Sequence, residues 1–336
     1  MRSDRILLAH GSGGTLMREL IEEVFLGEFT DDALARMDDA AALDFAGGRL
    51  AFSTDTYVVT PQFFPGGDIG RLAVCGTVND VATSGATPLF LSVGFVLEEG
   101  FPVEDLKRVL VSMRDAAAEA GVRIVTGDTK VVEKGHGDGI YINTAGVGVL
   151  PEGLDLSGSN VVPGDKVLLS GTLGDHGIAV VSTREGLSFS TSIESDAAPL
   201  NALVAAVLEA APGVRCFRDP TRGGLASTLN EIAAASGVCI TVEETAVPVR
   251  DQVRGACEML GYDVFQVANE GKMVAVVPAD EADMALEAMR GAPYGADAAV
   301  IGEVDAESSG RVYVHTAFGA RRIMDMLVGE QLPRIC

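Results

Sequence analysis

The stretch PVEDLKRVLVSMRDAAAEAGVRIVTGDTK, residues 102–130, decides the fold class. Pro102 suits the first turn of a helix, apolar residues then recur with helical period, and Gly121 is a typical helix end. The next residues predict a strand that ends in a turn at GDTK, residues 127–130. A second strand, 140–149, follows directly. Strands that alternate with helices and then follow one another indicate an α+β domain rather than a doubly wound sheet.

The rest of the chain extends this pattern to a second domain. At 336 residues, the chain is long for one core and comfortable for two domains. The sequence predicts a glycine-rich segment with a helix, a first domain, a linker rich in Gly, Ser and Pro, a second α+β domain, and a tail. These segments are 1–35, 36–150, 151–165, 166–328 and 329–336.

Composition excludes several classes of partner. Forty-eight acidic and 25 basic residues give a net charge of −23, which argues against nucleic acid and anionic membranes. We find no apolar signal core and no run long enough to span a bilayer, and therefore expect a cytoplasmic protein. The cysteines are scattered and odd in number, which favours reduced thiols over disulfides or zinc. They are Cys75, Cys216, Cys239, Cys257 and Cys336.

The last residues, PRIC at 333–336, place a cysteine at the end of the sequence. Pro333 stops a helix, so we expect the tail after Gly329 to be extended and mobile. At about 3.3 Å per residue, the Cys336 sulfur would then sweep roughly 23 Å. That reach would let the sulfur visit another protein and return to its own site. From the tail alone, a frayed end without a function is the alternative.

Four aspartates are candidates for binding a cation. Asp38, Asp55, Asp80 and Asp128 come from four different elements and lie beside small or polar residues rather than in charged runs. Mg²⁺ prefers oxygen ligands and usually keeps substrate phosphates as partners, so a few convergent carboxylates are the expected protein contribution. Lys130 could neutralise a phosphate. For each of these aspartates taken alone, a solvated surface position is the alternative.

Two glycine-containing stretches could bind phosphate. Gly11, Gly13 and Gly14 precede a helix, where backbone N–H groups and the helix dipole point at the same place. This stretch matches neither Walker A nor G-x-G-x-x-G, so a flexible turn is an equal alternative. In DPTRGGL, residues 219–225, Arg222 and two glycines open another helix and form a second possible anion site.

Together these stretches resemble the HypE family of hydrogenase maturation factors, within the PurM-like ATP-binding proteins related to aminoimidazole ribonucleotide synthetase. The similar blocks run in order along nearly the whole chain. They are FSTDTYVV (52–59), FFPGGDIG (63–70), CGTVNDVA (75–82), TGDTK (126–130), DPTRGG (219–224) and PRIC (333–336). Several are shared with the wider superfamily, whereas the PRIC ending points to the HypE family itself.

The resemblance implies a fold, a cofactor and partners. It implies a homodimer whose N-terminal domains form a β-barrel at the interface, an α/β C-terminal domain, and ATP with Mg²⁺ in a cleft. A carbamoyltransferase, HypF, would place a carbamoyl group on Cys336. ATP would phosphorylate the carboxamide oxygen, and loss of phosphate would leave a thiocyanate. The HypC–HypD complex would carry the cyanide to the iron of a [NiFe] hydrogenase.

It also implies roles for single residues. Cys336 would carry the carbamoyl group, and Lys130 would steady the transferring phosphoryl charge. The amide nitrogen must lose two protons, and Glu270, with His136 behind it, is the candidate base. The four aspartates named above would hold Mg²⁺. The expected nucleotide-binding residues are Gly11, Gly13, Gly14, Asp38, Asp55, Asn79, Asp80, Asp128, Thr129 and Arg222.

Other functions remain open on the sequence. Selenophosphate synthetase shares the ATP scaffold, but it uses a Cys or Sec and a Lys near the N-terminal glycines, and residues 10–15 contain neither. Aminoimidazole ribonucleotide synthetase and thiamine monophosphate kinase do not explain the PRIC ending. A non-catalytic carrier of a group on Cys336 is a different class, against which the acids at element ends argue.

Overall fold

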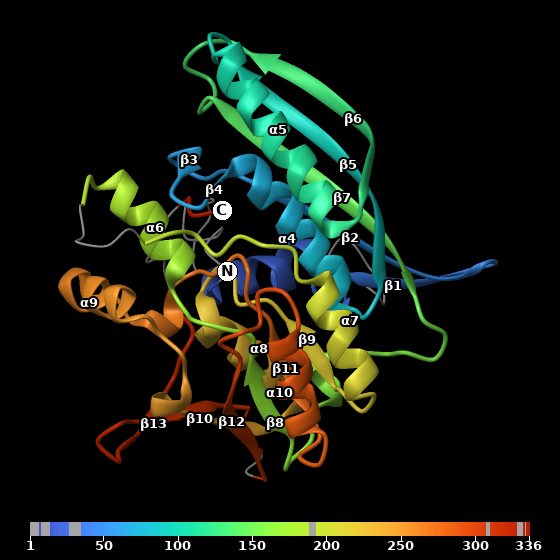
Figure 1. Ribbon diagram of the computed structural model, residues 1–336, viewed down its shortest axis with the longest axis vertical. Helices are drawn as coiled ribbons and strands as arrows, with labels where there is room; N and C mark the ends of the chain where they lie inside the picture. Colours follow the sequence, from blue (N-terminus) through green and yellow to red (C-terminus); the bar gives the residue numbers. More distant parts are fainter. Residues whose placement is uncertain are drawn as a thin grey trace.

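The computed structural model describes residues 7, 14–26, 35–187, 193–306, 310–327, 332 and 334–336. It has two domains stacked along the long axis, each built on one sheet with helices (Figure 1). The prediction of a two-domain α+β fold is confirmed. Within the described residues, no helix is both long and apolar enough to cross a membrane.

The first domain is a five-stranded sheet with helices on one face. Its order is β1-β2-β7-β5-β6, and only the β5–β6 pair is parallel. Helix α4 (Ile69–Thr83) packs on this sheet and α5 (Val103–Ala120) packs on α4. A short hairpin, β3 (Phe63–Phe64) with β4 (Gly67–Asp68), precedes α4. The five strands are β1 (Ala41–Phe45), β2 (Gly48–Tyr57), β5 (Thr87–Glu98), β6 (Arg123–Val132) and β7 (Ile140–Leu150).

Helix α5 confirms the expectation for residues 102–121, since it ends at Gly121 with a left-handed φ of 72°. The expected turn at 127–130 is wrong, because these residues lie inside β6. The parallel ladder with β5 continues from Val93–Gly127 to Glu98–Val132 and satisfies the backbone groups that a turn would leave free. The sheet neighbour therefore overrides the local turn signal of Gly-Asp.

Among the described residues, no helix packs on the other face of the first sheet. Phe52, Phe90 and Val149 are 44%, 40% and 46% exposed on this face, and β6 is an edge strand. In one chain the sheet is open. The barrel expected from two copies stays a prediction, and this apolar face with a free edge is the surface that such a barrel would use.

The second domain is a seven-stranded mixed sheet between two layers of helices. Its order is β14-β13-β10-β12-β8-β11-β9. Helices α7 and α10 share one core with the sheet, and α8 packs in a core on the other face. The strands are β8 (Lys166–Leu169), β9 (Cys216–Arg218), β10 (Cys239–Glu243), β11 (Val274–Val277), β12 (Ala299–Asp305), β13 (Val312–His315) and β14 (Arg321–Ile323). The helices are α6 (Asp175–Arg184), α7 (Asn201–Ala210), α8 (Gly224–Ser236), α9 (Asp251–Leu260) and α10 (Ala282–Gly291).

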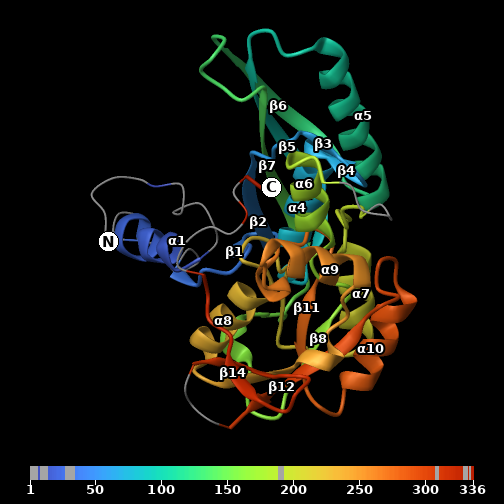
Figure 2. The same cartoon turned by 90° about the vertical axis from the view of Figure 1, so that its left-hand side faces the viewer.

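Two smaller segments lie outside the two sheets and their helices. Residues 151–165 connect the sheets and contain one 3-10 turn, Gly158–Asn160. Near the start of the chain, α1 (Thr15–Leu20) continues as a π-helix, Ile21–Phe25, and stands to one side of the main body (Figure 2).

The end of the chain differs from the mobile tail that we expected. Its described residues are docked between α6 and the first sheet (Figures 1 and 2). The Val58 N–H donates to Cys336 O at 3.0 Å, and the Thr60 N–H donates to Arg334 O at 3.2 Å. Ile335 packs in a core cluster shared by both domains. Satisfied backbone groups and buried apolar side chains account for the docking. Pro333 lies outside the described residues.

Candidate active site between the two domains

The inner face of β2 forms the floor of the site. Because side chains alternate along a strand, Ser53, Asp55 and Tyr57 all point toward α4. The Ser53 hydroxyl donates to Asp80 Oδ2 on α4 at 2.9 Å. Gly76 of α4 makes room for the phenol, since a Cβ there would lie 2.2 Å from the Tyr57 hydroxyl oxygen. The blocks around Asp55 and Asp80 thus meet through one strand and one helix.

A group of carboxyl groups gathers above this floor. Burial raises the pKa of Asp80 well above its ordinary value, and the neighbouring charges of Asp219, Asp55 and Asp39 raise it further. Burial likewise raises the pKa of Asp219 to about 6, although Arg218 opposes the shift. Carboxylates that repel one another in this way are stabilised when a cation binds among them. The residues described include no group of three or more His, Cys, Asp or Glu arranged to hold a metal ion.

Cys336 lies at the edge of this group. Its buried thiol hydrogen-bonds to the carboxyl of Glu270, and its pKa is raised well above the ordinary value by burial and then by the Glu270 charge. The Arg222 guanidinium opposes that shift. Arg222 Nη2 lies 3.9 Å from Asp55 Oδ1, so one cation faces both the thiol and the carboxylates. The docked thiol is therefore protonated and unreactive as a nucleophile.

Glu270 lies in the turn 269–272, just before β11. Burial raises its pKa well above the ordinary value, and the charges of Asp219 and Asp55 add to the shift. Its Oε1 atom accepts no hydrogen bond from the described protein atoms. A buried carboxyl with a raised pKa and a free oxygen is suited to take a proton from a bound group. The structure brings this candidate base to the candidate thiol.

Asp128 and Lys130 lie elsewhere within one chain. They form an ion pair of 2.5 Å on β6, with both side chains 69% exposed, and Lys130 lowers the pKa of Asp128. Asp128 pairs with Gly94, Gly94 with Asn143, and Asn143 with Thr56 of β2. At about 4.8 Å per strand, three strand spacings separate Asp128 from β2 by about 14 Å. Asp128 therefore does not join the Asp55–Asp80 group of its own chain.

Asp38 and Asn79 have structural partners. Asp38 Oδ2 accepts from Arg36 Nε at 2.9 Å, and Asp38 lines a small pocket below the first sheet. The Asn79 amide donates to Ala198 O at 3.0 Å and accepts from the Leu200 N–H at 2.7 Å. Asn79 thus ties α4 to the segment before α7, which leaves little of its amide for a nucleotide.

The other predicted residues lie farther from the thiol. His136 is exposed in the connection between β6 and β7, where its charge acts on Glu98. Thr129 neighbours Asp128 on β6, and its N–H donates to the Asp128 carboxylate at 2.8 Å. Gly14 caps the start of α1, next to Leu327. Gly11 and Gly13 lie outside the described residues.

Several residues at the site were missed from the sequence. Asp219 stands in the quoted DPTRGG block, and Tyr57 follows Asp55 by two, so period-2 alternation could have found both. Asp39 follows Asp38 and forms an ion pair with Arg218 at 3.1 Å. His176 and Asp196 carry no local signal, because only the domain packing brings them close to the end of the chain.

Comparison with known proteins first defines the class. The model for the N-terminal domain of AIR synthase related proteins matches residues 37–150, and the model for their C-terminal domain matches residues 162–315. The protein is thus an AIR synthase related protein of two domains. Thiamine monophosphate kinase from Aquifex aeolicus, 18% identical with a TM-score of 0.66 over 93% of this chain and 99% of that one, shares the fold alone.

Closer relatives then define the family. Carbamoyl dehydratase HypE of Azotobacter vinelandii is 54% identical over 336 residues, which cover 100% of this chain and 98% of that protein. The HypE of Escherichia coli K12 is 49% identical over 338 residues, covering 99% of this chain and 100% of that protein. The chain belongs to the HypE family, the carbamoyl dehydratases of hydrogenase maturation, and the prediction of an enzyme of this family is confirmed.

Solved structures agree. The structure of a hydrogenase maturation protein HypE in complex with ATP is 49% identical, with a TM-score of 0.84 over 99% of this chain and 100% of that one. HypE in a HypE–HypF complex is 53% identical, with a TM-score of 0.87 over 92% of this chain and 99% of that one.

Proposed function

We propose that this protein dehydrates a carbamoyl group on its own Cys336 at the expense of ATP. The observation that carries the proposal is the contact between two groups from distant parts of the chain. A thiol at the end of the chain and the buried carboxyl of Glu270 hydrogen-bond to each other between the domains. A group attached to that sulfur would bring its nitrogen and oxygen beside Glu270 Oε1, which has no hydrogen-bond partner among the described residues.

The chemistry follows from what must leave. The carboxamide oxygen is a poor leaving group, so ATP transfers its γ-phosphoryl group to that oxygen and ADP departs. Breaking the C–O bond then releases phosphate and leaves S–C≡N. The amide nitrogen loses both of its protons on the way, and Glu270 receives them in turn and passes them to solvent or phosphate. The thiocyanate is the cyanide source for the iron of a [NiFe] hydrogenase, handed on through a HypC–HypD complex.

Positive charge is needed where the phosphoryl group moves. Arg222 is half-buried and faces Asp55, Glu270 and Cys336, so it would neutralise an anion there. Asp55, Asp80 and Asp219 do not form a metal-binding group by themselves, but their mutual repulsion raises the pKa of Asp80 after burial does, and a cation shared with the phosphates would relieve it. These residues would hold Mg²⁺, with Asp38 at the neighbouring pocket. When bound, Mg²⁺ would offset the charge of the phosphates.

A second copy would complete the site. Asp128 and Lys130 are exposed on the edge strand β6, on the sheet face that no helix of the described residues covers. Closing two such sheets into one barrel would bring these residues of one copy to the phosphates bound by the other. The homodimer is therefore part of the proposal, and ATP would lie in the cleft at that interface.

The partner step requires the tail to leave its docked position. The docked thiol has a raised pKa and is protonated, whereas only a thiolate can accept a carbamoyl group efficiently. We place carbamoylation by a HypF carbamoyltransferase on the undocked tail, where the Glu270 charge and burial no longer act on the sulfur. The loaded tail then returns to the site for dehydration.

The test compares Cys336→Ala with the parent, using ATP binding and carbamoyl transfer as separate readouts. The variant is expected to bind ATP and dimerise like the parent but to accept no carbamoyl group from the carbamoyltransferase. Cys257→Ala is the matched control, because that thiol is also buried but lies on α9. Carbamoyl acceptance by Cys336→Ala would overturn the proposal.

A further inference from the structure

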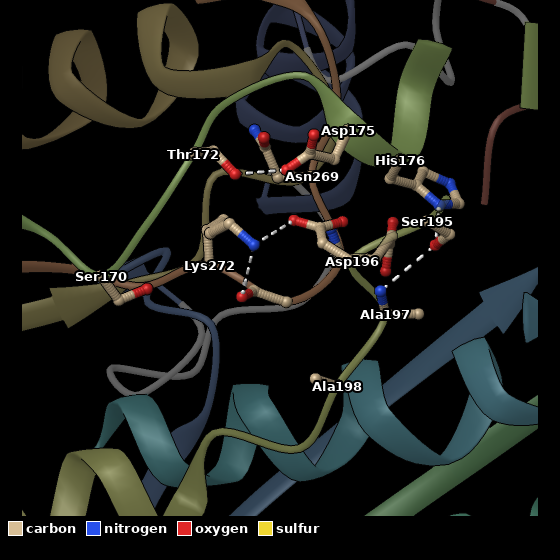
Figure 3. Close-up of polar contacts among 12 residues, drawn as sticks. Ser170, Thr172, Asp175, His176, Ser195, Asp196, Ala197, Ala198, Asn269 and Lys272 are labelled. Atoms are coloured by element: carbon tan, nitrogen blue, oxygen red, sulfur yellow. Dashed lines mark hydrogen bonds and ion pairs between the residues drawn. The ribbon is translucent and has the colours of Figure 1, made fainter. Parts of the chain in front are cut away.

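One short segment links the turn that carries Glu270 to the end of the chain. Ser195 and Asp196 precede α7 and lie between α6 and the turn 269–272 (Figure 3). The segment is also tied to the first domain, since the Ser195 N–H donates to Pro65 O at 2.8 Å. The position of this segment therefore determines where both the Glu270 turn and the end of the chain lie.

Asp196 holds the Glu270 turn. Its Oδ1 accepts from the Glu270 N–H at 3.0 Å, and its Oδ2 lies 2.9 Å from Lys272 Nζ (Figure 3). The Lys272 and Asp196 side chains are only 8% and 5% exposed. Gly271 allows the two backbones to touch, because a Cβ there would lie 1.8 Å from Asp196 O. These contacts hold the backbone of Glu270 against Asp196.

Ser195 holds the end of the chain through His176. His176 Nδ1 lies 2.8 Å from the Ser195 hydroxyl, and His176 Nε2 lies 2.8 Å from Ile335 O. A carbonyl oxygen only accepts, so Nε2 carries the ring proton, and the Ser195 hydroxyl donates to Nδ1. The imidazole is fully buried, and burial lowers its pKa, which keeps it neutral. Ile335 is the residue before the thiol.

We propose that Ser195 and Asp196 form a brace that holds the Cys336 sulfur and the Glu270 carboxyl in fixed positions relative to each other. In this brace, His176 is the positioning residue for Cys336, and Asp196 is the positioning residue for Glu270. The chemical consequence rests on the function proposed above. The docking of the tail by His176 does not, and it can be measured without ATP or a partner protein.

The first measurement is the rate at which iodoacetamide alkylates Cys336 in the full chain, followed by peptide mass. His176→Phe removes the hydrogen bond to Ile335 O but keeps a ring of similar size. One hydrogen bond is worth about 1 kcal/mol, so the labelling rate should rise roughly five- to tenfold. His176→Gln can donate to Ile335 O and should restore most of the protection. His315 is an exposed histidine of β13 that pairs with Glu243 of β10, so His315→Phe is the control and should label like the parent.

The second measurement is dehydration of protein already carbamoylated on Cys336. His176→Phe and Ser195→Ala should lower kcat by roughly tenfold while the KM for ATP stays constant, because they misplace the loaded sulfur and not the nucleotide. Asp196→Asn tests the Glu270 side of the brace in the same assay. It leaves the Lys272 charge uncompensated, so Ser195→Ala is the variant to rely on if Asp196→Asn does not fold.

The outcomes separate the two proposals. Faster labelling in His176→Phe, with no dehydration even by the parent, would keep the docking role and reject the proposed reaction. Parent-like labelling together with a parent-like kcat in His176→Phe and Ser195→Ala would overturn the brace. A rise in the KM for ATP with kcat unchanged would also overturn it, since that places the residues at the nucleotide.

Discussion

Replacing Glu270 with glutamine should separate the chemistry from the fold. Glutamine keeps the length of the side chain and the backbone N–H that donates to Asp196. Because Glu270 Oε1 accepts no hydrogen bond from the described atoms, the exchange breaks none at that oxygen. It removes only the negative charge and the capacity to take a proton. A slower dehydration in this variant should therefore reflect the missing base and not a change in the fold.

The expected size follows from the role of a general base. Such groups contribute about 10²- to 10⁴-fold, which corresponds to about 3 to 5 kcal/mol of barrier at 1.36 kcal/mol per tenfold. ATP-dependent loss of water from the carbamoylated Cys336 should slow by that factor in Glu270→Gln. ATP binding and carbamoyl acceptance should stay near the parent values, because neither step needs the base.

Glu270→Gln should slow dehydration but raise the free energy of unfolding. The folded pKa of Glu270 lies above its ordinary value of 4.5, mainly through burial. The folded state therefore binds this proton more tightly than the unfolded state, and the free energy of unfolding falls as the pH rises from 4.5 toward the folded pKa. Glu270→Gln removes that fall, so its advantage over the parent in urea unfolding should grow from acid to neutral pH.

The assay is a single-turnover mass measurement on pre-carbamoylated protein, combined with urea unfolding at several pH values. A dehydration rate within a few-fold of the parent would refute Glu270 as the base. A variant that loses stability at neutral pH would refute the electrostatic description of the site, because the Glu270 charge would then be stabilising.

Further changes test the remaining parts of the site. Asp80→Asn should weaken Mg-ATP binding at least tenfold and raise the free energy of unfolding, as isothermal titration and urea unfolding would show, because it removes a buried charge that its neighbours repel. The pKa of Asp219 is raised to about 6, so the affinity for Mg²⁺ measured by titration should fall as the pH drops below that value and this carboxylate is protonated. Asp128→Asn and Asp80→Asn should each be inactive alone but partly restore dehydration when unfolded and refolded together, because a mixed dimer would hold one intact site; no recovery would contradict the shared site.

Local signals in the sequence predicted most of the scaffold. Helix α5 has its proline start, its apolar period and its glycine end, and the structure reproduces all three. The turn at GDTK failed because pairing with β5 decides the conformation of β6, and that pairing depends on residues some 35 positions earlier in the chain. A single sequence window contains no information on such a ladder.

In the site, too, local signals predicted some residues, and long-range packing determines the others. Asp55, Asp80, Arg222, Glu270 and Cys336 were expected from their types and neighbours, and the structure brings these five together. His176 and Asp196 were not expected, because their roles arise from the packing of α6 and residues 193–200 against the end of the chain. Burial and distant partners give these residues their properties, and neither is visible from the local sequence.

The docked tail has a related cause. Proline and a chain end favour an extended, free segment, but Arg334 has a left-handed φ of 55° and the described residues are docked. The segment is held because Val58 and Thr60, just after β2, donate their N–H groups to it. Arg184 and His176 also donate to the carbonyls of Arg334 and Ile335 at 2.7 and 2.8 Å. A docked state of this kind agrees with a tail that must present its sulfur to an internal base.

The intact mass of the protein, followed through two additions, tests whether Cys336 carries the group that is dehydrated. The protein is first incubated with its carbamoyltransferase and carbamoyl donor, and Mg-ATP is then added. The proposed function predicts one carbamoyl increment on the Cys336 peptide, followed by the loss of one water when ATP is present. A carbamoyl increment that ATP leaves unchanged, or an increment on another residue, would contradict it.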